Sequence, residues 1–139
     1  MSNPYSLVKE FHSTFNIPKA DINNKEALLF RLRLIAEEFE EVMDAANCQF
    51  SRSMYGPVEV YEHRDGSLNR ASLLKELADL LYVIYGTAET FGWDIDEAFK
   101  RVHQSNMSKL DEAGRPIYRE DGKVIKGKFY KEPDLKDLV

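Results

Sequence analysis

The sequence holds few of the residues that crosslink a chain or interrupt its helices. Cys48 is the single cysteine among 139 residues, so an internal disulfide is excluded and a zinc site would need other ligands. Glycine and proline are scarce, at 7 and 5 residues. No segment approaches the roughly 18 consecutive apolar residues of a membrane span, and the N-terminus has no signal-peptide pattern. These features predict a cytoplasmic protein that does not contact a membrane.

An excess of basic charge is also missing. Lysine and arginine number 19 against 24 aspartates and glutamates, which gives a formal charge of -5. Proteins that bind a nucleic-acid polymer neutralise its phosphates with basic side chains, so this balance argues against such a partner. The length and the 43% hydrophobic content predict one globular domain over residues 1–139. A charged small molecule bridged by a cation stays compatible with the composition.

Four segments carry apolar residues at the spacing of an amphipathic helix. They are expected at about residues 4–15, 25–47, 70–91 and 94–110. In the second segment, an apolar stripe that includes Leu32 and Phe39 predicts the buried face. The third segment is apolar or aromatic on all sides over residues 80–85, which predicts contacts on several sides, including another subunit.

The remaining segments are short and irregular. Residues 49–70 are an excursion that can include a small hairpin, because Gly56–Pro57 is a turn signal. Asp121–Gly122 lies between apolar pairs and predicts a hairpin-like C-terminal tail. The predicted fold is therefore all-α: a four- to five-helix bundle with a helical body over about 4–110 and a tail over about 111–139.

Two pairs of carboxylates occupy matching positions on the second and third helices. Glu38 and Glu41 are three residues apart beside the apolar stripe of the second helix, and Glu76 and Asp79 have the same spacing in the third. Four acids on the inner shoulders of packed helices repel one another unless a divalent cation neutralises them. Oxygen ligands select hard cations, so the pattern predicts a Mg2+ site in which Mn2+ can substitute.

Other interpretations of these residues stay open. Acidic helical turns are usually solvated faces that bind nothing. A di-iron carboxylate site fits less well, because it needs Glu-x-x-His and no glutamate here has a histidine three residues later. His103 and Cys48 lack catalytic partners at a telling spacing, which favours a packed histidine and a plain thiol.

The last quarter of the chain adds candidate substrate-binding residues. Asn106 falls in the middle of the apolar stripe of the fourth helix, so it is expected to be buried with partners, either as a core amide or as an amide directed at a ligand. Lys109 follows on a neighbouring face. In the tail, Lys126 and Lys128 alternate with apolar residues. These lysines are either exposed strand residues or a basic flap over a polyphosphate.

The acidic pattern resembles the signature of a known superfamily. Glu37-Glu38-x-x-Glu41 followed by Glu76-x-x-Asp79 is similar to the EExxE...ExxD motif of the all-α nucleoside triphosphate pyrophosphohydrolases. Members of this superfamily include the MazG-like proteins, the all-α dUTPases and phosphoribosyl-ATP pyrophosphohydrolase. Residues 103–110 and 114–135 resemble a bacterial and phage branch. The interval between the two motif halves is longer than in compact members, and the excess falls in residues 49–70.

The resemblance implies a particular chemistry. It implies Mg2+-dependent hydrolysis of a nucleotide between the α and β phosphates, which releases a monophosphate and pyrophosphate. On this resemblance Glu38, Glu41, Glu76 and Asp79 hold the metal, and Glu37 ligates it or activates the attacking water. One amide and three lysines of the last quarter would contact the substrate: Asn106, Lys109, Lys126 and Lys128. A homodimer or homotetramer is implied as well.

Two further hypotheses come from other functional classes. The first is a non-catalytic bundle that binds a nucleotide with Mg2+ and leaves it uncleaved. The second is a structural oligomerisation module whose acids are solvated. The presence of all expected ligands favours the enzyme, but no motif identifies the base or the sugar.

Overall fold

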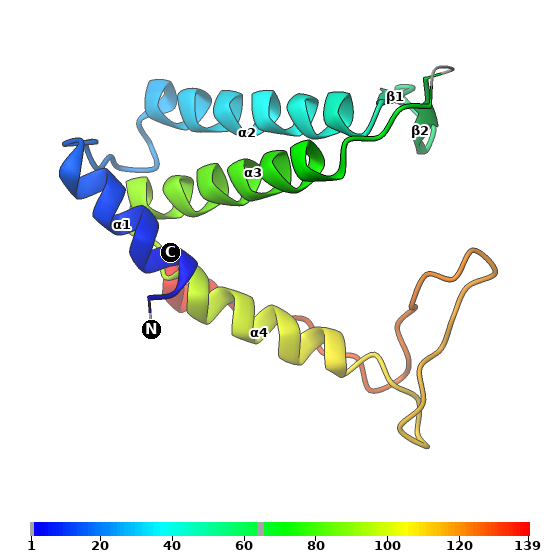
Figure 1. The fold of residues 1–139 in the computed structure, drawn as a ribbon. Helices are drawn as coiled ribbons and strands as arrows, with labels where there is room; N and C mark the ends of the chain where they lie inside the picture. The colour runs from blue at the N-terminus through cyan, green and yellow to red at the C-terminus, as the bar shows by residue number, and fades with distance from the viewer. Residues whose placement is uncertain (1, 64–65) are drawn as a thin grey trace. The chain divides into compact units, whose positions relative to one another are not determined.

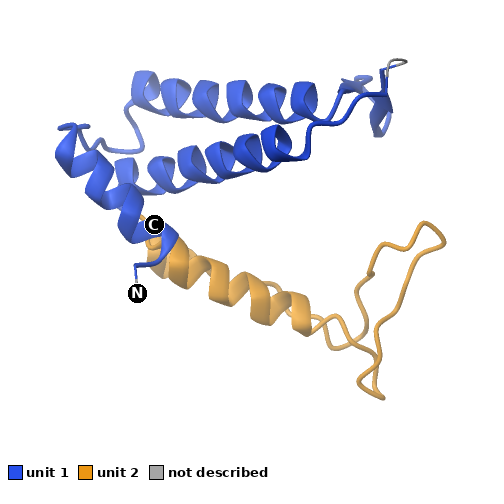
Figure 2. Ribbon diagram, viewed as in Figure 1, with its two compact units in different colours: residues 1–92 blue, residues 93–139 orange. Residues whose placement is uncertain are grey.

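The computed structural model describes residues 2–63 and 66–139. The chain divides into two compact units, Met1–Gly92 and Trp93–Val139 (Figure 2). Unit 1 holds three helices and a two-stranded sheet: α1 (Pro4–Thr14), α2 (Lys25–Ala45), β1 (Cys48–Arg52), β2 (Val58–Glu62) and α3 (Arg70–Phe91). Unit 2 holds α4 (Ile95–Met107), a long tail and the short 3-10 helix η1 (Lys136–Leu138). Within the described residues, no helix combines the length and the apolar character needed to cross a bilayer.

Each α-helix begins at a side chain that accepts a hydrogen bond from the first turn. Asn3 accepts from the backbone amide of Ser6 at 2.8 Å, and Asn69 accepts from that of Ser72 at 3.0 Å. Asn24 and Asp94 cap α2 and α4 in the same way. Short polar side chains satisfy amides that a helix leaves unpaired at its N-terminus. These caps explain why the helices begin within a residue or so of their predicted starts.

Helices α2 and α3 lie side by side and run antiparallel (Figure 1). Arg31 near the start of α2 donates to the backbone carbonyl of Val83 at 3.2 Å, in the second half of α3. Glu38, two turns later in α2, meets Glu76 in the first half of α3. The face of α2 that carries Arg31 and Glu38 is therefore the one that packs against α3.

The prediction of the buried face of α2 was correct only in part. Four residues of the predicted apolar stripe are half-buried: Leu28, Ile35, Val42 and Ala46. Leu32 and Phe39, also expected inside, are 48% and 36% exposed, whereas Arg31 is only 6% exposed. The buried side of α2 is therefore turned from the centre of the stripe towards Arg31 and Glu38. Helical periodicity identifies an apolar face but does not say which neighbour covers it.

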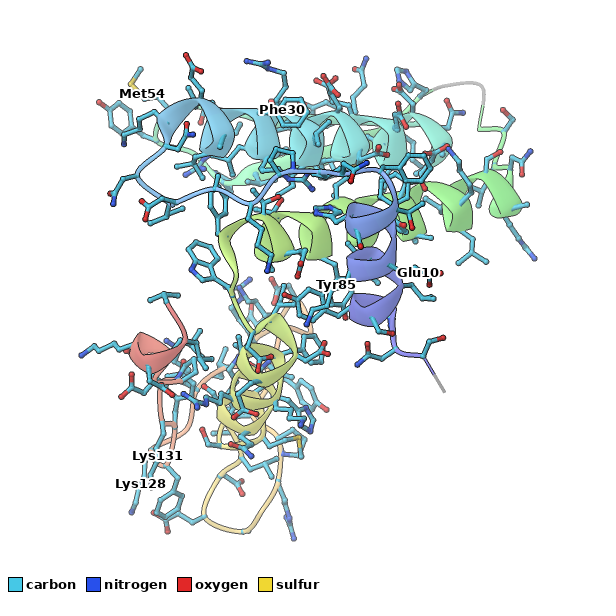
Figure 3. All side chains as sticks on the ribbon, turned by 90° about the vertical axis from the view of Figure 1, so that its left-hand side faces the viewer. Glu10, Phe30, Met54, Tyr85, Lys128 and Lys131 are labelled. Carbon is cyan, nitrogen blue, oxygen red and sulfur yellow. The ribbon has the colours of Figure 1, made fainter. Side chains whose placement is uncertain are left out.

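Helix α1 packs on the second half of α3 through a partly polar contact. Val8 is 1% exposed, and Tyr5 stacks on Tyr85 of α3 with ring centroids 5.7 Å apart (Figure 3). The Tyr5 hydroxyl donates to the carboxylate of buried Glu89 at 3.2 Å. Burial, and next the neighbouring Arg31 guanidinium, lower the pKa of His12, while Glu89 opposes that shift. His12 is therefore neutral at pH 7.

The excursion between α2 and α3 contains a true hairpin, so the fold is mostly helical and the all-α prediction needs correction. Strands β1 and β2 pair antiparallel, with Phe50 opposite Val60. Phe50 also packs edge-to-face on Phe39 of α2, with ring centroids 5.3 Å apart. This contact fastens the hairpin to the last turns of α2. Residues 64 and 65 of the predicted excursion lie outside the described residues.

In unit 2 the tail leaves α4 and returns along it. The predicted turn at Asp121–Gly122 is confirmed, because Tyr118 and Val124 form an antiparallel bridge across it. Further on, the Ser105 hydroxyl donates to the carbonyl of Lys131 at 2.7 Å. Arg101 forms an ion pair with Asp137 in η1, so the end of the chain is fixed to α4.

Candidate functional site

The contact between α2 and α3 brings together three of the predicted metal ligands. Glu38, Glu76 and Asp79 each offer a carboxylate oxygen, and these oxygens all lie within 4.8 Å of one another. Glu76 and Asp79 are three residues apart and share one face of α3. The antiparallel packing places Glu38 of α2 opposite that face. The spacing on each helix and the pairing of the helices together build the cluster.

Glu38 is the member of the cluster whose charge is not compensated. One oxygen of Glu38, Oε2, is buried and has no hydrogen-bond partner. The pKa of Glu38 is raised above its ordinary value, first by burial and then by the negative charges of Glu41, Asp79 and Glu76. A buried carboxylate surrounded by other carboxylates is unstable without a positive charge. The donor set of oxygens only, with one of them orphaned, fits a hard divalent cation such as Mg2+ or Mn2+.

The other two acids of the motif lie at the rim. Glu41 is exposed, one helical turn after Glu38, and is close enough to raise the pKa of Glu38. It is outside the group of three oxygens. Glu37 is exposed on the adjacent side of α2. Its predicted catalytic role stays a prediction.

A lysine that the sequence analysis did not single out touches two of the acids. Lys75 Nζ lies 2.7 Å from Asp79 Oδ2 and 3.3 Å from Glu76 Oε1. The i,i+4 spacing of Lys75 and Asp79 was a signal that could have identified this contact. Asp79 and Glu76 raise the pKa of Lys75 through hydrogen bonds and charge, so it is fully protonated.

The predicted substrate-binding residues all belong to unit 2. Asn106 is exposed, which contradicts the prediction that it is buried; its neighbour Ser105 is buried instead, because its hydroxyl bonds to the returning tail. Lys109 is half-buried. Lys128, in the tail in Figure 3, forms an ion pair with Glu112. Lys126 Nζ lies 4.5 Å from the ring centroid of Tyr130. Their contact with a substrate stays a prediction.

Unit 1 contains cavities large enough for part of a nucleotide. One of about 620 Å³ lies between α2 and the hairpin, and aromatic rings of Phe39, Phe50 and Tyr61 line it together with Glu40 and Asp44. A second, of about 370 Å³, is enclosed by α1, α2 and α3 and includes buried Arg31 in its wall. Ligand sites in proteins commonly have such volumes and mixed linings.

The fold and the site therefore define a mostly helical protein with a cluster of carboxylates, between two helices, that could hold a metal ion. The family model described as phosphoribosyl-ATP pyrophosphohydrolase matches residues 8–106, which is more than half of the chain and includes the five acids of the EExxE...ExxD pattern. The chain belongs to this family. The family resemblance drawn from the EExxE...ExxD pattern is thereby confirmed.

The individual proteins that resemble this chain share about a quarter of its residues. An uncharacterized protein of Acanthamoeba polyphaga mimivirus is 27% identical over 97% of this chain. The chain spans about half of that relative, 47% of its length. A solved structure of a candidate NTP pyrophosphohydrolase from Exiguobacterium sp. 255-15 is 25% identical; the match covers 95% of this chain and 89% of the other, with a TM-score of 0.40.

Proposed function

We propose that this chain hydrolyses a nucleoside triphosphate, or a related nucleotide, between its α and β phosphates. The products would be a nucleoside monophosphate and pyrophosphate. The observation that carries the proposal is the cluster of Glu38, Glu76 and Asp79 with its orphaned oxygen, in a chain of the phosphoribosyl-ATP pyrophosphohydrolase family. We further propose a cytoplasmic location, consistent with Cys48 as a free thiol.

The acids would divide the work between binding and proton transfer. Glu38, Glu76 and Asp79, joined by Glu41, would hold Mg2+, which supplies positive charge to a polyphosphate when bound. Glu37, which directly precedes the metal ligand Glu38, would orient the attacking water and accept its proton as a general base. The carboxylates would also exclude a substrate that arrives without a cation, since they repel its phosphates.

Basic and aromatic groups would complete substrate binding. Lys109, Lys126 and Lys128 would contribute positive charge to the leaving pyrophosphate, and Asn106 would orient a sugar or phosphate group. The aromatic cavity between α2 and the hairpin offers a surface on which a base can stack.

The test is a product analysis over a panel of canonical and modified triphosphates and phosphoribosyl nucleotides with Mg2+. We expect a monophosphate and pyrophosphate in equal amounts, and no turnover when EDTA is added. Release of orthophosphate and a diphosphate would contradict cleavage between the α and β phosphates. Nucleotide binding without any product would instead indicate the non-catalytic alternative.

We also propose that the working form is a homodimer or homotetramer. Helix α3 exposes a row of leucines on the side opposite to α2: Leu74 at 69%, Leu77 at 47% and Leu81 at 46%. Within the described residues, the buried hydrophobic side chains are few: Tyr5, Val8 and Ala88. A chain of this length that leaves so much apolar surface in water gains stability when a second copy covers it.

Replacing Leu77 by glutamate is expected to convert the oligomer into monomers. The new charge would be buried without a partner in any interface formed by the leucine row. Light scattering coupled to size-exclusion chromatography measures the mass directly. Leu68→Glu, a leucine 53% exposed before the start of α3, is the matched control and should keep the mass of the wild-type protein. A monomeric wild-type protein would contradict the proposal.

A further inference from the structure

Lys75 contacts the two acids that α3 contributes to the cluster, Glu76 and Asp79. Its ammonium group lies 2.7 Å from Asp79 Oδ2, and within hydrogen-bond distance of both oxygens of Glu76, at 3.3 and 3.4 Å. Both acids also offer oxygens to the three-carboxylate group. The lysine therefore contacts the same side chains that a divalent cation would use.

The lysine satisfies only part of the cluster. On α2, Glu38 Oε2 keeps no hydrogen-bond partner in spite of the ammonium group across the contact. The ammonium group contacts Glu76 and Asp79 of α3, whereas a divalent cation with six or more oxygen ligands can take oxygens from both helices at once. Glu38 of α2 is thus the acid of the cluster that still needs a positive charge, which a metal ion would supply.

Lys75 is also free to leave. Its side chain is 64% exposed, and its ion pairs to the described residues are with Glu76 and Asp79 of its own helix. Exposed ion pairs of this kind contribute little to stability, so breaking them costs little. A metal ion placed among the same carboxylates would repel the ammonium group at short range.

We propose that Lys75 is the resident counter-ion of the site and that a divalent cation must displace it in order to bind. This inference rests on the proposed metal-dependent function. Lys75 is a positioning residue: it holds Glu76 and Asp79 in place while no metal is bound, and it lowers the apparent affinity for the metal. Once displaced, its ammonium group stays within one side-chain length of the cation, at the rim where a polyphosphate would lie.

The experiment compares metal affinity in the absence of nucleotide. Calorimetric titration of the full chain with Mn2+ is done on the wild-type protein, Lys75→Met and Lys75→Arg, with Lys100→Met, an exposed lysine of α4, as the matched control. We expect Lys75→Met to bind Mn2+ about three- to tenfold more tightly, since no ion pair is broken first. Lys75→Arg and Lys100→Met should bind as the wild-type protein does.

A second measurement separates displacement from a general change in stability. In EDTA, Lys75→Met should melt below the wild-type protein, because its acids have lost their counter-ion; with saturating Mn2+ the difference should disappear. Equal or weaker Mn2+ affinity in Lys75→Met overturns the displacement. Absence of Mn2+ binding by the wild-type protein would contradict the proposed metal site itself, which is a different result. Lys75→Gln repeats the test with a polar side chain.

Discussion

Replacing Glu38 by glutamine is expected to stabilise the metal-free protein and to abolish hydrolysis. The pKa of Glu38 is raised above its ordinary value of 4.5, so the folded state holds this proton to a higher pH than the unfolded state does. The stability of the metal-free protein therefore falls as the pH rises from about 4.5 through the raised pKa of Glu38. A neutral amide removes both the buried charge and its repulsion by Glu41, Asp79 and Glu76. It also removes a metal ligand, and turnover should fall at least about 100-fold.

Thermal melts in EDTA between pH 4 and pH 8, together with the product assay, measure both effects. The melting temperature of Glu38→Gln should exceed that of the wild-type protein by a margin that grows with pH. Glu40→Gln makes the same chemical change two residues later, on the side of α2 that lines the hairpin cavity, and is the matched control. A Glu38→Gln protein that melts at a lower temperature than the wild-type protein in EDTA would contradict the destabilising charge of Glu38. A Glu38→Gln protein that keeps its turnover would contradict its role as a metal ligand.

Replacing Gly86 by valine should have the largest effect on folding. A Cβ atom at this position would lie 2.2 Å from Arg31 Nη2 and 3.0 Å from His12 Nε2, so three helices meet at a residue without a side chain. The guanidinium would have to leave the carbonyl of Val83, and a buried charge would lose a hydrogen bond. We expect a loss of about 3 kcal/mol in the free energy of unfolding from overpacking and the lost bond.

Denaturant melts check this value, with Ala71→Val on the exposed side of α3 as the control for placing a β-branched side chain in this helix. Shortening the partner in the double variant Gly86→Val/Arg31→Met should reduce the cost of the valine, since the collision is with the guanidinium. Because Arg31 and Glu38 share the face of α2 that packs on α3, Gly86→Val should weaken Mn2+ binding too. A stable Gly86→Val protein with unchanged metal affinity would contradict this account.

The helix boundaries were predictable because local chemistry sets them. Helix α3 runs over the predicted Arg70–Phe91, since Asn69 caps its start and Gly92, with a φ of 72°, takes the left-handed conformation that ends it. The acid pairs were predictable for a similar reason: i,i+3 spacing places both members on one helical face whatever surrounds the helix.

The partners of each face could not be predicted in the same way. The apolar stripe of α2 predicted Leu32 and Phe39 inside, but these two are exposed, and Arg31 and Glu38 take part in the contact with α3. Choosing between these faces depends on distant residues that happen to satisfy a buried arginine, which no local pattern records. Asn106 was misplaced for the same reason, because the tail that covers α4 bonds to Ser105.

The antiparallel pairing of α2 and α3 also makes the position of the acid cluster independent of the length of the segment that connects the two helices. The hydrogen bond from Arg31 to the carbonyl of Val83 is one contact that sets how far one helix is shifted along the other, and this shift places Glu38 opposite Glu76. The chain between Ala46 and Asn69 does not set that shift; it only has to return to the start of α3. A family built on this arrangement can lengthen or shorten the segment, trading a bare turn for a hairpin with its own cavity, while the carboxylates stay opposite one another. Variation in length at this connection therefore leaves the acid cluster in register and changes only what surrounds it.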